Sequence, residues 1–203
     1  MLIACWSTKG GVGTTVVAAA LALTLARVAD DGAVLADLAG DAPAVLGLAE
    51  PSSPGLAGWL SAGDSVPADA LARIEVEAAP GLGVLPRGEG RLLADRAEVL
   101  AAVLDGARRA AVADCGRFDD PAAAAVIGRA SRSLLVTRPC YLAMRRIHRA
   151  PVRPSAVVLI CEPGRVLSRD DVVAAAGSSK RPQSATAARR APSSCGARSR
   201  SRA

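Results

Sequence analysis

Short apolar runs alternate with longer segments rich in Ala and Leu along most of this chain. Residues 2–6 form an apolar run typical of a buried strand, and residues 14–29 have the composition of a helix that ends at an Asp-Asp-Gly turn. A Gly-rich turn at residues 9–13 joins them, and residues 33–37 predict a second strand that ends in an acid. The order strand, Gly-rich loop, helix, strand predicts a βαβ unit with parallel strands.

The same alternation continues to about residue 176. Residues 39–54 contain Gly and Pro and predict a loop, and the helix predicted over residues 91–104 gathers Leu and Ala on one face. Because strands and helices alternate, we expect an α/β fold, a mostly parallel twisted sheet with helices on both faces. The other strands are predicted over residues 82–85, 110–114, 133–137 and 156–161, and the other helices over residues 55–62, 68–73, 121–130, 141–149 and 169–176.

Composition indicates one domain followed by a tail. The chain has 203 residues, of which 51% are hydrophobic and 2% aromatic, so the core must be built from small aliphatic side chains. Residues 1–177 carry 18 basic and 19 acidic residues and are predicted to form the folded domain. Residues 178–203 carry seven basic residues, no acid and no apolar periodicity, and we expect them to be disordered.

The basic tail has more than one interpretation. Its charge is typical of an arm that binds nucleic acid or acidic lipid. It lacks the apolar face of an amphipathic membrane helix, which disfavours anchoring of that kind. An abrupt change to Arg, Ser, Ala and Pro is also what a GC-rich gene translated out of frame would produce.

Cysteines and apolar segments indicate where the protein resides. The five cysteines form no C-x-x-C pair and the chain has one His, so no zinc-site spacing is present. Cys5, Cys115 and Cys161 fall in or beside predicted strands and are interpreted as small core residues, with a redox role as the alternative. We see no secretory leader and no transmembrane segment, and expect a cytoplasmic protein, or one bound peripherally to the inner membrane.

Residues 8–15, Thr-Lys-Gly-Gly-Val-Gly-Thr-Thr, carry the clearest chemical signal. Three glycines within four residues let the backbone approach a ligand, and the loop leads into the positive end of a helix, which favours anions. In a standard phosphate-binding loop, N–H groups hold the phosphates, a Lys reaches the β/γ oxygens and a hydroxyl ligates Mg²⁺. Thr15 stands at the hydroxyl position, but Thr14 replaces the usual Lys and Thr8 the first Gly.

This loop resembles the deviant Walker A motif of the MinD/ParA family of P-loop ATPases, which includes pilus-positioning members. The resemblance implies a P-loop NTPase-like fold, ATP and Mg²⁺ as cofactors, and a homodimer formed around the nucleotide. Lys9 is the family's signature residue and would contact the nucleotide of the partner subunit. The resemblance implies that the nucleotide is held by Lys9, Gly10, Gly11, Val12, Gly13, Thr14 and Thr15.

Three further segments resemble parts of that family's site. Residues 34–37 resemble the strand before switch I, which makes Asp37 a catalytic candidate beside Lys9. Residues 111–116 resemble the Walker B strand and switch II, so Asp114 is a third catalytic candidate that would join Thr15 in holding the magnesium shell, and the Gly116 N–H would meet the γ-phosphate. Residues 158–165 resemble a base-contacting turn, with Glu162 where the family has Asn, which leaves adenine or guanine preference open.

Two departures from the family pattern point the same way. Thr14 removes a fixed positive charge from the β/γ oxygens, and electrostatic contacts of that kind usually contribute most to the catalysis of phosphoryl transfer. Ala39 replaces the acid that positions the attacking water, with Asp41 as a shifted substitute. We therefore expect weak nucleotide binding and slow or absent ATP hydrolysis.

The sequence leaves three functional hypotheses open. The first is a MinD/ParA-like switch whose ATP-stabilised dimer recruits a protein partner in septum-site determination, chromosome partitioning or pilus placement. The second is a non-catalytic scaffold of the same fold that binds no nucleotide. The third is a partition protein that binds DNA through Arg-rich surfaces, including the tail at residues 178–203. The family continues with another strand and helix after the position where this tail begins.

Overall fold

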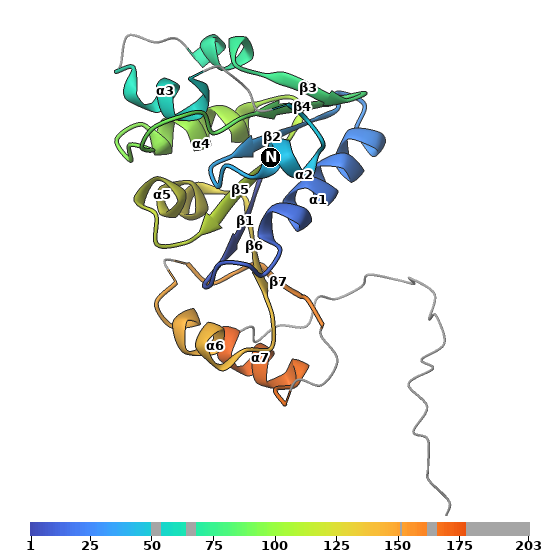
Figure 1. Cartoon of the computed structure of the whole chain (residues 1–203), viewed down its shortest axis with the longest axis vertical. Coiled ribbons are helices and arrows are strands. Elements are labelled where there is room, and N and C mark those ends of the chain that lie inside the picture. Colours follow the sequence, from blue (N-terminus) through green and yellow to red (C-terminus); the bar gives the residue numbers. More distant parts are fainter. Residues whose placement is uncertain (50–53, 64–67, 151, 162–165, 178–203) are drawn as a thin grey trace, which may run out of the picture.

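The computed structural model describes residues 1–49, 54–63, 68–150, 152–161 and 166–177, and over these residues the chain forms a seven-stranded sheet (Figure 1). Neighbouring strands are parallel except for β3 and β4, which confirms the predicted α/β class with a mostly parallel sheet. The strands lie in the order β3-β4-β2-β5-β1-β6-β7. Their bounds are β1 (Leu2–Ser7), β2 (Ala33–Asp37), β3 (Val76–Ala79), β4 (Leu82–Leu85), β5 (Ala110–Arg117), β6 (Arg132–Thr137) and β7 (Ala156–Leu159).

Helices cover both faces of the sheet, as the alternating pattern predicted. Because successive strand residues point to opposite faces, Leu2, Ala4 and Trp6 join the core beneath α3 to α7, whereas Cys5 joins the core beneath α1 and α2. The helices are α1 (Thr14–Val28), α2 (Ala42–Val45), α3 (Gly55–Ser61), the 3-10 helix η1 (Ala68–Arg73), α4 (Ala97–Gly106), α5 (Pro121–Arg129), α6 (Tyr141–Ile147) and α7 (Arg169–Ala176).

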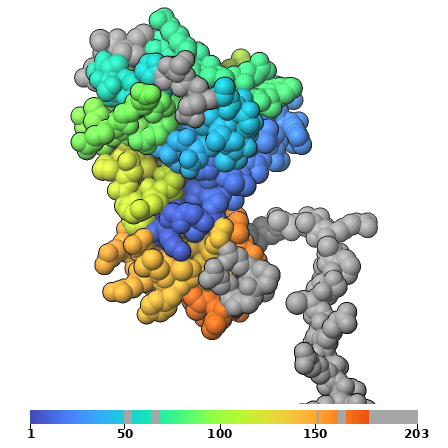
Figure 2. Space-filling model, in the orientation of Figure 1, coloured from blue at the N-terminus to red at the C-terminus, as the bar shows by residue number. Residues whose placement is uncertain are grey.

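The strand order fixes where the Gly-rich loop lies. Strand β1 pairs with β5 on one side and with β6 on the other, so residues 8–15, the glycine loop, emerge between the carboxyl ends of those two strands. In the space-filling view the blue N-terminal segment lies between the yellow region around residue 120 and the orange region of α6 (Figure 2). Ligand sites of open parallel sheets lie at this edge.

Two elements were not predicted, β5 runs three residues past its predicted end, and one helix begins later than predicted. The short helix α2 and the strand β3 were missed. The sequence of β3, Val-Glu-Ala-Ala, has no apolar alternation, and the strand lies at the edge of the sheet. The helix predicted over residues 91–104 begins only at Ala97. Leu92 is nevertheless buried, whereas Leu93 is 40% exposed, so the apolar pattern marked a segment that packs on the core without being helical.

The cysteine predictions are confirmed at two positions and wrong at a third. Cys5 and Cys115 are buried, and burial raises the pKa of the Cys5 thiol to about 12 and that of Cys115 well above its ordinary value. Both thiols therefore stay protonated and act as small core groups. Cys161 is exposed, because β7 ends at Leu159, two residues earlier than predicted, at the open edge of the sheet.

Among the described residues, no helix is long and apolar enough to span a membrane. The predictions for Glu162 and for residues 178–203 lie outside the described part of the chain.

Candidate functional site

The glycine loop adopts a conformation that its glycines make possible. Gly11 and Gly13 have φ angles of 73° and 93°, a region that side chains with a Cβ rarely adopt. Gly13 is the N-cap of α1, and no side chain caps that end of the helix. The first N–H groups of this 15-residue helix therefore point into the space at its N-terminal end, which is a favourable position for an anion.

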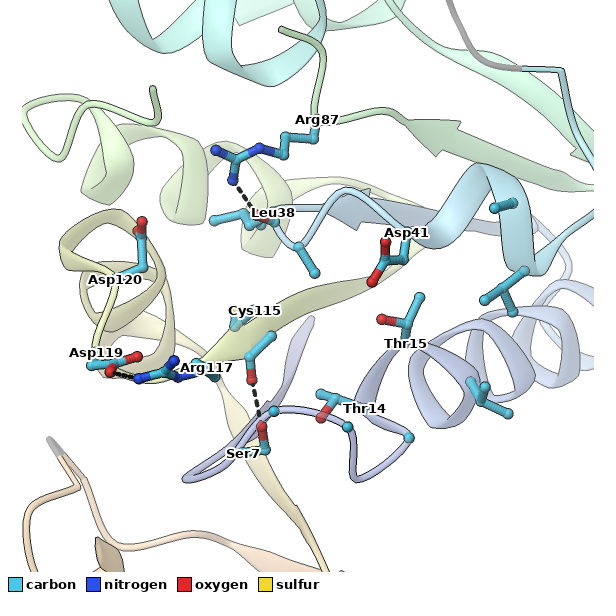
Figure 3. Close-up of a pocket in the computed structure, with 18 of the residues that line it drawn as sticks. Ser7, Thr14, Thr15, Leu38, Asp41, Arg87, Cys115, Arg117, Asp119 and Asp120 are labelled. Atoms are coloured by element: carbon cyan, nitrogen blue, oxygen red, sulfur yellow. Dashed lines mark hydrogen bonds and ion pairs between the residues drawn. The ribbon is translucent and has the colours of Figure 1, made fainter. Parts of the chain in front are cut away.

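A hollow of about 1010 Å³ opens in front of the loop (Figure 3). Its lining comes from the loop and the start of α1, from residues within 38–45 after β2, from residues within 115–121 at the end of β5, and from Arg87 and Arg138. Binding pockets commonly measure about 300–1,000 Å³, so this hollow has the size of a small-molecule site.

Asp114 lies beneath the hollow with no exposed surface. Its Oδ1 accepts a hydrogen bond of 3.0 Å from the Gly116 N–H, whereas its Oδ2 is buried without a hydrogen-bond partner among the described residues. Burial raises the pKa of this carboxyl to about 6, against the lowering effects of the Thr15 hydroxyl and the Gly116 N–H. A buried carboxylate oxygen of this kind suits a hard cation or a water bound to it, so Asp114 and Thr15 fit the predicted magnesium shell.

Asp37 is also fully buried, but its carboxylate is used by its own loop. Its two oxygens accept hydrogen bonds from the N–H groups of Gly40, at 2.7 Å, and Ala42, at 3.0 Å. Burial raises the pKa of Asp37, and these N–H groups oppose that effect. Asp37 does not line the hollow, and in this conformation it holds the loop that carries Ala39 and Asp41.

Backbone and side-chain contacts join the three segments around the hollow. The Ser7 hydroxyl at the end of β1 donates to the Gly116 carbonyl at 3.0 Å, and the Leu38 N–H donates to the Asp114 carbonyl at 2.9 Å. A Cβ placed on Gly116, which has a φ of 55°, would lie 3.1 Å from the Cβ of Ala39. The end of β1, the loop after β2 and the end of β5 therefore form one connected rim.

The structure brings most of the predicted nucleotide residues to this hollow. Gly10, Gly11, Gly13, Thr14, Thr15 and Gly116 line it. Val12 is buried and Lys9 is half-buried, and neither lines the hollow. Asp41, suggested by sequence as a shifted acid, is exposed and points toward Thr15 (Figure 3).

Three arginines of the described residues line the hollow and were not predicted: Arg87, Arg117 and Arg138. Each follows or ends a strand, so their positions at strand ends were the only sequence signal available. Arg87 donates through Nη1 to the Leu38 carbonyl at 2.7 Å and through Nη2 to the Gly90 carbonyl at 3.2 Å. Arg117 forms an ion pair with Asp119.

The first residue of the glycine loop is bound to helix α6. The Thr8 hydroxyl donates to the Ala143 carbonyl at 3.2 Å, and Arg146 donates to the Thr8 carbonyl at 3.4 Å. Thr8 is buried at this contact. The entrance to the loop is thus fixed by α6 as well as by β1.

Solved structures with this architecture include several ATPases. A ParA family ATPase from Chlorobium tepidum TLS superposes with a TM-score of 0.68, covering 87% of this chain and 79% of that one at 18% identity. The septum site-determining protein MinD from Pyrococcus horikoshii OT3, complexed with Mg-ADP, gives 0.65 at 19% identity, covering 86% and 76%. The MinC:MinD cell division protein complex from Aquifex aeolicus gives 0.64 at 20% identity, covering 87% and 77%. By sequence, the chain matches no family model and no curated protein.

Proposed function

Since the chain has the fold of the ParA and MinD ATPases, we propose that it is a nucleotide-dependent positioning switch that binds ATP with Mg²⁺ in the hollow above the glycine loop. The observation that carries this proposal is the left-handed backbone of Gly11 and Gly13 at the start of α1, facing a hollow large enough for a triphosphate. One related fold was solved with Mg-ADP, which supports the same ligand class here.

Each residue of the site has a role in this proposal. The N–H groups of the loop would hold the phosphate oxygens, and the Thr15 hydroxyl and Asp114 would hold a magnesium ion through its waters. Bound magnesium would supply positive charge beside the phosphates. The partnerless Oδ2 of Asp114 supports this assignment, because binding of the metal shell would satisfy it.

Lys9 has its role in the dimer. It does not line the hollow of its own chain, which supports a contact with the nucleotide of a second copy. ATP would then stabilise the dimer, and the dimer would recruit a partner of the division, partition or pilus machinery. The related MinC:MinD complex supports a protein as that partner.

Hydrolysis in this site should be slow or absent. Thr14 contributes no charge to the phosphates, and Ala39 contributes no acid to position water. Asp41 is the one carboxylate within residues 38–45 that lines the hollow, and it is exposed to solvent, where it orders water poorly. The bound state would therefore persist and act as the recruiting form.

Calorimetry of the full chain with ATP and Mg²⁺ tests the proposal. We expect binding that weakens at least tenfold with EDTA or in Thr15→Ala, while Thr24→Ala, which removes an exposed hydroxyl further along α1, binds as the wild type. Light scattering should show an ATP-dependent dimer that Lys9→Ala abolishes. Absence of ATP binding would favour the scaffold hypothesis, and salt-sensitive DNA retention that depends on residues 178–203 would favour the DNA-binding one.

A further inference from the structure

Two of the arginines that line the hollow flank the glycine loop. The loop follows β1, which lies between β5 and β6 in the sheet. Arg117 is the last residue of β5, and Arg138 is the residue after the end of β6. Because the carboxyl ends of parallel strands lie side by side, these two residues flank the loop on opposite sides, and both line the hollow.

Arg117 lies beside the loop. Its Cδ lies 3.9 Å from the position that a Cβ on Gly10 would occupy, an ordinary van der Waals distance, so the arginine stem runs close to the loop at Gly10. Its guanidinium is oriented by the ion pair with Asp119 (Figure 3). Both side chains are about half exposed. Arg117 and Asp119 both line the hollow, so an anion bound there would compete with the Asp119 carboxylate for the guanidinium.

The loop itself brings little charge to the hollow. Thr14 is neutral, and Lys9 does not line the space. Arg87 lies on the far side, where both of its terminal nitrogens donate to backbone carbonyls. A triphosphate bound here carries several negative charges, and a guanidinium binds phosphate oxygens through two parallel N–H groups.

We propose that Arg117 and Arg138 bind the phosphate chain from the two sides of the glycine loop and supply the positive charge that a lysine at position 14 would supply. This inference rests on the proposed function, because it concerns the same nucleotide. It explains how a loop without the lysine can still bind phosphate, because arginines at the ends of the neighbouring strands supply the positive charge.

The test compares arginine variants of the full chain. The variants are Arg117→Gln, Arg138→Gln and Arg138→Lys, and the control is Arg27→Gln, an exposed arginine in the last turn of α1 that does not line the hollow. Competition against a fluorescent ATP analogue gives the affinities for ATP and AMP in the presence of Mg²⁺. Thermal melts establish that each variant is folded.

We expect each glutamine variant to bind ATP on the order of 10-fold more weakly, with AMP affinity changed less than about twofold. Arg138→Lys keeps the charge and should retain most of the ATP affinity, and Arg27→Gln should match the wild type. Adding Thr14→Lys to a double variant that carries both Arg117→Gln and Arg138→Gln should restore ATP binding by about 10-fold or more.

Two outcomes separate this inference from the proposed function. If the wild type binds ATP and both glutamine variants bind it within about twofold of the wild type, the arginine assignment is wrong and the nucleotide site stands. If the wild type binds no ATP at all, the nucleotide site itself is wrong, and the arginine assignment fails with it.

Discussion

Asp37 and Asp114 are register partners on the neighbouring strands β2 and β5, and neither side chain has any exposed surface. The first has both oxygens hydrogen-bonded to its loop, whereas the second keeps one oxygen without a partner among the described residues. The negative charge of Asp37 also raises the pKa of Asp114, in addition to the larger effect of burial, and Asp41 adds to it. The two carboxylates therefore repel each other, and a bound cation would reduce this repulsion.

Replacing Asp114 with Asn should stabilise the chain at neutral pH in the absence of nucleotide and magnesium. The folded pKa is raised to about 6 from 3.8, so the folded state binds the proton more tightly than the unfolded state, and stability falls as pH rises between these values. At pH 7 Asp114→Asn should gain on the order of 3 kcal/mol. Urea unfolding at pH 5, 7 and 8 measures this, and the gain should be smaller at pH 5.

The matched control for that change is Asp37→Asn. An amide at this position has one acceptor oxygen in place of two, so the N–H of Gly40 or Ala42 loses its partner. We expect Asp37→Asn to lower stability at pH 7 by about 1–3 kcal/mol. Stabilisation of similar size by both substitutions would show that burial alone matters, and not the partnerless oxygen of Asp114.

Thr14→Lys should raise the affinity for ATP by about tenfold or more. The side chain at position 14 lines the hollow, so an ammonium there adds a charge-assisted contact to the phosphate oxygens. Thr14→Gln, which is long but neutral, should not reproduce the gain. Calorimetry with ATP measures both, and an unchanged affinity in the lysine variant would count against a phosphate site in front of this loop.

Gly13→Ala should weaken ATP binding by about 5- to 30-fold, the equivalent of its backbone strain, whereas Gly47→Ala should leave ATP binding unchanged. Both glycines have a positive φ, 93° and 71°, and a Cβ on either would contact nothing within 4 Å, so each alanine brings backbone strain of about 1–2 kcal/mol and no clash. Of the two positions, only Gly13 belongs to the glycine loop. A backbone change that relieves the strain there would turn the N–H groups of the loop away from the hollow. Thermal melts should show similar losses of stability for the two variants, and equal ATP affinities would contradict the role of the loop backbone.

Arg96→Leu should destabilise the fold by about 3 kcal/mol. The Arg96 side chain is only 7% exposed, its guanidinium lies 4.1 Å from the centre of the Trp59 ring, and its Nη1 donates to the Trp59 carbonyl at 2.9 Å. Arg129→Leu removes an exposed ion pair with Glu98 and should cost less than about 1 kcal/mol. Urea unfolding compares the two, and similar costs would argue against a structural role for the buried arginine.

Local features of the chain were predictable from sequence because they depend on neighbouring residues. The strand before the glycine loop, the helix after it and the loop glycines all follow from the order of apolar residues and Gly within residues 2–29. Asp37 was expected at the end of a strand and ends β2, whereas Asp114 was expected at the end of a strand that continues to Arg117. The direction in which the Asp37 carboxyl turns was not predicted, because the N–H groups of Gly40 and Ala42 decide it.

Features that depend on which strands pair could not be predicted from local sequence patterns. Arg117 and Arg138 flank the loop only because β1 lies between β5 and β6, and no local pattern announces that order. For the same reason Cys161 was wrongly placed in the core, since a strand at the edge of the sheet ends where pairing ends and not where apolar residues end.

The hydrogen bonds between Thr8 and α6 connect the glycine loop to a helix whose first residues are exposed to solvent. Tyr141 and Leu142, at the start of α6, are exposed, while Arg146 and Ala143 of the same helix hold Thr8 from both sides. Any displacement of α6 must either carry the first residue of the loop along or break both hydrogen bonds. A ligand that immobilises the loop would therefore restrict the motion of α6. A partner that binds α6 would in turn change the affinity of the loop for its ligand.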